Sequence, residues 1–293
     1  MKQNVSPKQD LKIAECSSMT LLRQIHNQLS SPSESPYLDA LVLLGHVTGQ
    51  SKSEILTHPS PSLTQEQEKI LSEGIRKLND GIPLPYVIGS WEFYQLSFVV
   101  TPDVLIPRPE TEGLVELALG WFQSHPGRRK CLELGTGSGC IAISLAKNLP
   151  DLHILATDIS NKALTVALEN AHGHQVEDQI EFIISDLLAG IGSKIDLLVA
   201  NLPYIPSNKL KSLPVYQTEP HLALDGGPDG LHYIKEVLAS AAQILNPGGG
   251  IFLELDEECG VTAHSIAGSH FPESDLTLSR DLAGQDRYLI IQT

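Results

Sequence analysis

Apolar residues in the first 80 positions recur every three or four residues, the spacing of one helix face. They form three stripes: Leu21, Leu22, Ile25 and Leu29; Leu38, Leu41, Val42 and Leu44; and Ile70, Leu71, Ile75 and Leu78. Ser51 with Glu54 and Thr64 with Gln67 match capping boxes. Ser35-Pro36 is a good helix start after the Ser/Pro-rich loop 30–36. We therefore expect a helical domain over residues 1–85.

A segment of another type follows this domain. Residues 91–100 are rich in aromatic and β-branched side chains, which predicts two short strands in a hairpin. Pro102, Pro107 and Pro109 come directly after it. We expect residues 86–104 to form a hairpin linker between two domains.

From about residue 130, strand-like and helix-like segments alternate. Strands are expected at 131–134, 154–157, 180–184, 195–200 and 251–255, and helices near 140–148, 162–171 and 231–245. Two more strands, 276–280 and 287–292, complete the pattern. The alternation predicts an α/β fold over residues 105–293, with a Rossmann-like, mostly parallel sheet that has helices on both faces.

The composition narrows the choice of partners. The 293 residues carry a formal net charge of -15, which repels phosphate backbones and speaks against a nucleic-acid partner. Cys16, Cys131, Cys140 and Cys259 show no C-x-x-C spacing, so we expect no metal site and no disulfide. Residues 1–12 lack a secretory or transit pattern, and no apolar run reaches the roughly 18 residues of a membrane span. We expect a soluble, cytoplasmic protein.

A glycine-rich run after the first strand of the alternation predicts a cofactor site. Gly135-Thr136-Gly137-Ser138-Gly139 leads from strand to helix, where glycines allow a sharp turn and close approach of a ligand. This spacing is shorter than the G-x-G-x-x-G of dinucleotide enzymes, which leaves room for a pyrophosphate. Asp158 could bind ribose hydroxyls, and Ser185-Asp186 could reach an adenine. A ribose and an adenine without phosphates indicate S-adenosyl-L-methionine, with S-adenosyl-L-homocysteine as product, rather than NAD.

The tetrapeptide Asn201-Leu202-Pro203-Tyr204 ends the fourth strand and is the candidate for substrate binding and catalysis. An amide nitrogen is a poor nucleophile because its lone pair is delocalised into the carbonyl. Accepting hydrogen bonds from both its N–H groups would orient it and offset the developing charge. The Asn201 side-chain oxygen and the Leu202 carbonyl could each accept one, and Tyr204 could cover the planar group. We expect that the transfer needs no metal and no base beyond water. The tetrapeptide alone also fits an ordinary turn.

Four motifs extend along the chain: Gly81–Tyr86 with Gly89 and Glu92-Phe93; Val104–Glu112; Glu133–Gly139; and Glu219–Leu231. Together they resemble the peptide chain release factor glutamine methyltransferases of the HemK type over nearly the whole chain. The resemblance implies a class I methyltransferase domain, with the glycine loop, Asp158, Asp186-Leu187 and Asn201 at S-adenosyl-L-methionine. It also implies methylation of the Gly-Gly-Gln glutamine of class I release factors, which the N-terminal domain helps to dock.

Two departures from the family pattern keep other interpretations open. The family usually has Asn-Pro-Pro-Tyr, whereas Asn-Leu-Pro-Tyr also resembles the motif of ribosomal RNA adenine dimethyltransferases. Glu254-Leu255-Asp256 stands where Glu-x-Gly followed by Gln is usual. The alternatives are an adenine methyltransferase of RNA or DNA, a ribosomal-protein glutamine methyltransferase, and a cofactor-binding module without catalysis. The run around Arg108 could line a domain interface or contact substrate directly.

Overall fold

The computed structural model describes residues 20–29 and 35–293. The predictions for residues 1–12, for Cys16 and for most of the Ser/Pro-rich loop lie outside these ranges. The chain divides into two compact units, Met1–Ile88 and Gly89–Thr293. The expected linker, residues 86–104, spans this division.

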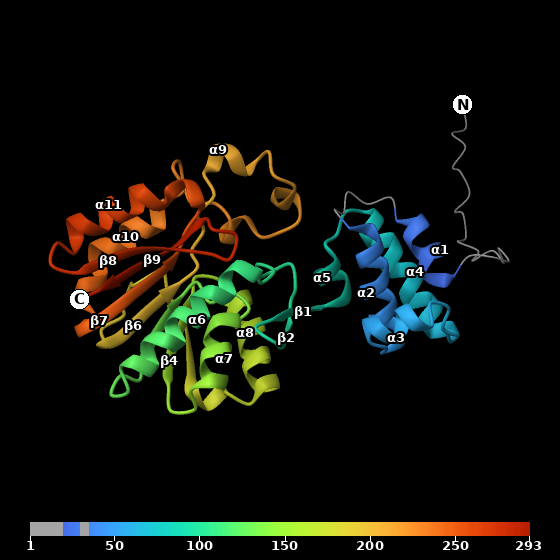
Figure 1. Cartoon of the computed structure of the whole chain (residues 1–293), viewed down its shortest axis with the longest axis horizontal. Helices are drawn as coiled ribbons and strands as arrows, with labels where there is room; N and C mark the ends of the chain where they lie inside the picture. Colours follow the sequence, from blue (N-terminus) through green and yellow to red (C-terminus); the bar gives the residue numbers. More distant parts are fainter. Residues whose placement is uncertain (1–19, 30–34) are drawn as a thin grey trace. The chain divides into compact units, whose positions relative to one another are not determined.

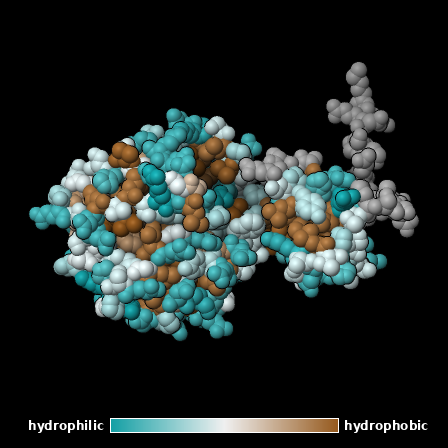
Figure 2. Space-filling model, viewed as in Figure 1, coloured by the Kyte–Doolittle hydropathy of each residue, from teal (hydrophilic) through white to brown (hydrophobic). Residues whose placement is uncertain are grey.

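The first unit is helical, as the apolar stripes predict. Its described helices are α1 (Leu21–Gln28), α2 (Pro36–Thr48), α3 (Lys52–Thr57), α4 (Gln65–Asn79) and α5 (Leu84–Ile88). Both predicted capping boxes form, at the starts of α3 and α4. Apolar side chains also reach the surface of this unit, as the brown areas of Figure 2 show. They include Tyr37, Leu38, Leu56, Ile70 and Ile82.

The predicted hairpin forms the start of the second unit. Strand β1 (Ser90–Phe93) pairs antiparallel with β2 (Leu96–Val99). Phe93 and Phe98 are buried in the same apolar core as side chains of the helical segments 114–122 and 140–146. The Asn170 side chain bonds both the N–H (2.7 Å) and the carbonyl (3.0 Å) of Val99. The hairpin is therefore an integral part of the second unit.

A sheet of seven strands forms the centre of the second unit. The strands are β3 (Lys130–Leu134), β4 (His153–Asp158), β5 (Ile180–Ile184), β6 (Ile195–Ala200), β7 (Leu245–Glu254), β8 (Asp275–Arg280) and β9 (Asp286–Gln292). Their order is β5-β4-β3-β6-β7-β9-β8, and β9 pairs antiparallel with both of its neighbours. The order reverses between β3 and β6. In such sheets ligands bind at this switch point, beyond the carboxyl ends of the strands.

Helices cover both faces of the sheet (Figure 1). On one face lie α6 (Pro109–Ser124), α7 (Cys140–Asn148) and α8 (Asn161–His174); on the other lie α10 (His232–Ser240) and α11 (Gly260–His270). Each face buries its own apolar core. The predicted fold class is confirmed.

Some element boundaries differ from those expected. The helix expected over 231–245 ends at Ser240, and a 3₁₀ turn, Ala241–Gln243, follows it. Strand β7 begins at Leu245 and not at residue 251, because Leu245 pairs with Ile195 before a bulge shifts the register. Helices α6 and α11 were not predicted. The prolines before α6 indicated a connector, yet Pro109 occupies the first turn of that helix, where its missing N–H costs nothing.

Candidate functional site

The glycine loop joins β3 to α7 at the switch point of the sheet. Gly135, Gly137 and Gly139 all have left-handed backbone, with φ of 67°, 55° and 81°. The Asp158 carboxylate accepts hydrogen bonds from the N–H groups of Gly137 (2.9 Å) and Ser160 (2.8 Å). Burial raises the pKa of Asp158. This side chain therefore fixes the shape of the glycine loop as well as facing the cavity next to it.

That cavity measures about 230 Å³ and brings together most of the residues predicted to bind cofactor. Those on its wall are Gly135, Gly137, Asp158, Asp186, Leu187 and Asn201. Two residues predicted to bind substrate, Leu202 and Pro203, lie on the same wall. Thr136, Ser138 and Gly139 are not on the wall. The Thr136 hydroxyl instead donates to Glu133 (2.7 Å), and the Ser138 carbonyl accepts from Asn170 (2.9 Å). Thr136 and Ser138 therefore fix the shape of the loop through bonds on the side away from the cavity.

Leu187 turns the chain sharply at the cavity. Its φ is 47°, a left-handed value that is unusual for a residue with a side chain. The Ser185 hydroxyl lies close to the carbonyls of Leu187 (3.0 Å) and Ala189 (2.8 Å) and holds this turn. Backbone held in such a conformation is common at ligand sites, where the surrounding structure imposes it.

Several wall residues of the cavity were not identified from the sequence. They are Pro102, Asp103, Val104, Leu105, Ile159, Ser160, Ala163, Pro220, Leu222, Ala223 and Tyr233. Ile159 and Leu222 are half exposed and give the cavity apolar surface. Two of the motifs, Val104–Glu112 and Glu219–Leu231, contain several of these residues, so membership in a motif was the available signal. Their position at the cavity depends on tertiary contacts.

A second cavity, of about 120 Å³, adjoins the strand-four loop, which we define as residues 201–204. Its wall is formed by Leu105, Arg108, Asn201, Tyr204, Ile205, Val215, Ala223 and Leu224. Asn201 lines both cavities. Its side-chain Nδ2 donates to the Thr111 hydroxyl at 3.0 Å. The opposite side of the amide, its oxygen, is therefore left available to accept a hydrogen bond at the junction of the cavities.

A buried carboxylate holds Arg108 at this second cavity. The Arg108 guanidinium forms an ion pair with Glu219, whose side chain is almost fully buried. The other oxygen of Glu219 accepts from the N–H of Ile106 (3.1 Å). Such charge-assisted bonds are among the stronger ones in proteins. The run around Arg108 was expected either to line a domain interface or to contact substrate. The Arg108 side chain lies on the wall of the cavity that Asn201 also lines.

Comparisons with known proteins agree with this geometry. A family model described as methyltransferase small domain matches residues 116–217, and the PrmC N-terminal domain matches residues 20–89. A release factor glutamine methyltransferase of Moorella thermoacetica is 40% identical over 256 residues, covering 87% of this chain and 90% of the relative. One of Rhodopirellula baltica is 36% identical, covering 89% and 90%.

The chain belongs to the release factor glutamine methyltransferase family. The resemblance found in its motifs is thereby confirmed. Among solved structures, the hMettl16 catalytic domain in complex with MAT2A 3'UTR hairpin 6 is similar in fold, with a TM-score of 0.52 and 16% identity. The aligned region covers 79% of this chain and 83% of the hMettl16 chain.

In this family member, two glycines, Gly226 and Gly230, pack directly against the strand-four loop. Ile205 forms a bridge with Asp225, and the Gly226 N–H donates to the Ile205 carbonyl at 2.8 Å. A Cβ atom on Gly226 would lie 2.6 Å from Tyr204 Cα, and one on Gly230 would overlap the Tyr204 carbonyl. Glycine at positions 226 and 230 of the motif Glu219–Leu231 therefore allows the backbone of this segment to approach the backbone of Tyr204 closely.

The segment Glu254-Leu255-Asp256, which departs from the family pattern, is well fixed. Leu255 exchanges hydrogen bonds with Arg287: its N–H donates to the Arg287 carbonyl (2.8 Å), and its carbonyl accepts from the guanidinium (3.0 Å). Asp256 caps the 3₁₀ turn Glu257–Cys259. Glu254 is buried, which raises its pKa to about 7, and the Tyr204 hydroxyl donates to its Oε1 at 3.4 Å. Burial also raises the pKa of Tyr204.

Within residues 20–29 and 35–293, no three His, Cys, Asp or Glu side chains gather as a metal site would require. In the same part of the chain, no helix combines the length and the apolar character of a membrane span.

Proposed function

We propose that the protein transfers the methyl group of S-adenosyl-L-methionine to the side-chain amide nitrogen of the glutamine in the Gly-Gly-Gln motif of class I release factors. The observation that carries the proposal is the position of Asn201, which lines both the cavity beside the glycine loop and the cavity beside Tyr204. Family membership indicates the acceptor, because curated relatives are release factor glutamine methyltransferases.

The larger cavity fits the cofactor by its chemistry. Asp158 is a buried carboxylate at the wall and can accept from ribose hydroxyls, while Ile159 and Leu222 offer apolar surface to a base. Asp186 and Leu187 lie on the same wall. When bound, the cofactor supplies an electrophilic methyl group on a sulfonium, which leaves as a neutral thioether.

The smaller cavity has the size of one side chain and would take the acceptor glutamine. The Asn201 oxygen and the Leu202 carbonyl would accept from the two N–H groups of the glutamine amide, and Tyr204 would cover its plane. Acceptors placed in advance stabilise the charge that develops on nitrogen. The methylated nitrogen then releases one proton to water, so the proposal needs neither a base nor a metal ion.

The proposal also assigns a docking role to the N-terminal domain and a cellular compartment to the reaction. The N-terminal helical domain (residues 1–85), with the linker 86–104 after it, would help to dock the release factor, and the apolar side chains exposed on the first unit support this role. The reaction would take place in the cytoplasm, where release factors act. The net charge of -15 favours a protein acceptor over an RNA or DNA adenine.

A methyl-transfer assay tests the proposal. Wild-type protein with labelled S-adenosyl-L-methionine is given purified release factor, ribosomal protein or RNA, and mass spectrometry locates the label. We expect the label on the Gly-Gly-Gln glutamine. Asn201→Ala should lower single-turnover transfer by about 100-fold or more, the usual effect of losing one placed hydrogen-bonding group. Its cofactor affinity should stay within a few-fold.

The matched control is Asn208→Ala, which removes an exposed Asn a short distance along the chain. It should leave transfer unchanged. Label on RNA or on a ribosomal protein, with release factors untouched, would assign the enzyme to one of the alternative substrate classes. Near wild-type transfer by Asn201→Ala would remove Asn201 from the mechanism.

A further inference from the structure

An asparagine amide can present either its oxygen or its NH₂ group to a ligand, because the two ends have nearly the same shape. Only the oxygen can accept from a substrate N–H. At Asn201 the bond from Nδ2 to the Thr111 hydroxyl (3.0 Å) distinguishes the ends. Thr111 lies in the first turn of α6 and is 2% exposed, so water does not compete for this bond.

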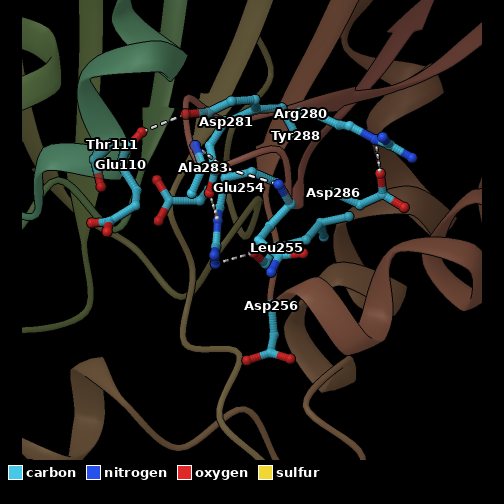
Figure 3. Close-up of polar contacts among 12 residues, drawn as sticks. Glu110, Thr111, Glu254, Leu255, Asp256, Arg280, Asp281, Ala283, Asp286 and Tyr288 are labelled. Carbon is cyan, nitrogen blue, oxygen red and sulfur yellow. Dashed lines mark hydrogen bonds and ion pairs between the residues drawn. The ribbon is translucent and has the colours of Figure 1, made fainter.

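A hydroxyl by itself does not settle the orientation, since it can donate as well as accept. Its neighbour Glu254 resolves this ambiguity. Figure 3 shows Thr111 and Glu254, which are both buried and lie at the start of α6 and at the end of β7. A hydrogen bond from the Thr111 side chain lowers the pKa of the Glu254 carboxyl, so the two groups lie next to each other. Glu254 Oε2 is buried and has no hydrogen-bond partner in the described part of the chain.

We propose that Thr111 and Glu254 are positioning residues that hold the Asn201 oxygen toward the acceptor nitrogen. An ionised carboxylate only accepts, so the Thr111 hydroxyl points its proton toward Glu254. Its lone pairs then face Asn201, where they accept only the NH₂ end of the amide. Glu254 also accepts from the Tyr204 hydroxyl (3.4 Å), so one buried carboxylate orients two side chains of the strand-four loop. The inference rests on the proposed function, of which it specifies the positioning.

The protonation state of Glu254 controls this arrangement. The neutral acid could donate to Thr111 and so remove the constraint on the hydroxyl. Burial is the largest cause that raises the pKa of Glu254, and Glu110 on α6 raises it too. Hydrogen bonds from Thr111 and Tyr204 and the charge of Arg287 on β9 lower it, and the net value is about 7. The constraint should therefore be complete only well above pH 7 and weaken as the pH falls through that value.

Single-turnover transfer to a release factor tests the inference through kinetics. Thr111→Val keeps the shape but removes the hydroxyl. It should lower the maximal single-turnover rate about 10- to 100-fold, while the release-factor concentration that gives half of that rate and the cofactor affinity change less than threefold. Thr111→Ser, which restores a hydroxyl, should recover at least a third of the wild-type rate. Thr165→Val, at an exposed threonine of α8, is the matched control and should change nothing.

The double variant separates positioning from general damage to the fold. With Asn201→Ala already present, Thr111→Val should cost less than a further threefold, because the residue it acts through is gone. Multiplying effects would show a structural role and overturn the inference. Glu254→Gln should lower the rate above pH 7 and abolish the inflection near pH 7. A wild-type inflection that persists in this variant would exclude Glu254.

A second measurement does not depend on the acceptor. In protein labelled with ¹⁵N at asparagine, the Asn201 side-chain NH₂ signals are assigned by their loss in Asn201→Ala. We expect slow solvent exchange of these protons in wild type and in Thr111→Ser, and exchange at least tenfold faster in Thr111→Val. Equal exchange in all three would overturn the inference even if release factors are methylated. Slow exchange with no methylation would instead refute the proposed function alone.

Discussion

Gly226→Ala adds a single methyl group at a position where the strand-four loop has no space for it. The new Cβ would lie 2.6 Å from Tyr204 Cα, 2.7 Å from the Tyr204 carbonyl carbon and 2.8 Å from the Pro203 oxygen. All three are backbone atoms, so no side-chain rotation relieves the overlap. Ordinary contact begins at 3.4 Å, and the loop must therefore move by about 3.4 − 2.6 = 0.8 Å.

A shift of this size predicts a loss of rate far larger than the loss of stability. Displacing reacting groups by about 1 Å commonly costs on the order of 100-fold in rate. Overpacking of this kind costs about 1–3 kcal/mol of stability. We therefore expect Gly226→Ala to be folded at 25 °C and to transfer methyl groups about 100-fold more slowly. The measurements are single-turnover methylation and urea unfolding of the same preparation.

Gly173→Ala is the matched control for this variant. Gly173 lies in α8 with nothing within 4 Å of its added Cβ, so alanine should be neutral or slightly stabilising there. Cofactor affinity, measured by calorimetry, should be little affected in either variant. If Gly226→Ala transferred at the wild-type rate, the close approach of the two backbones would have no part in placing the acceptor.

Three further variants test separate parts of the structure. Leu202→Pro should keep transfer within about threefold, because the carbonyl persists and the Leu202 N–H has no hydrogen-bond partner among the described residues; unfolding should show a loss of about 1–2 kcal/mol for the buried side chain. Asp196→Ala leaves Arg128, two backbone N–H groups and Asn246 without their acceptor, and should cost about 3–5 kcal/mol in urea unfolding with kcat unchanged. Burial raises the pKa of Glu133 from 4.5 to about 8, so its neutral form stabilises the fold fully below pH 4.5 and progressively less up to pH 8. Glu133→Gln should flatten the decline in unfolding free energy between pH 4.5 and 8, and an unchanged decline in this variant would contradict the assignment.

Sequence patterns identified the centre of the sheet well because its central strands are buried on both faces. Residues 195–200 are apolar apart from Asp196, and all six are buried in β6. The helix start at Pro109 was missed, since three prolines in eight residues also suit a connector. Helix α11 was missed because its run of small and polar residues carries little apolar periodicity. It packs through Gly260, Ala263 and Ala267, which bury little area each.

Many residues of the cavity beside the glycine loop could be predicted from the sequence, whereas the buried neighbours of Asn201 could not. Asp158 and Asp186 follow strands directly, and parallel strands bring their carboxyl ends to one edge. Thr111 is 90 residues before Asn201, and Glu254 is 53 residues after it. No local pattern relates residues so far apart. Their association depends on α6 packing beside the ends of β6 and β7, which only the folded chain shows.

The same packing explains how the family's usual proline can be absent. A proline at position 202 would stiffen the loop by restricting its own backbone. Here Leu202 is 4% exposed and belongs to the apolar core beneath the loop, which holds the residue from one side. Thr111 holds the Asn201 side chain, and Gly226 fits against the Tyr204 backbone. Each residue of the loop is thus fixed by a different partner, so the Leu202 carbonyl is aimed by tertiary contacts as well as by the Pro203 that follows it.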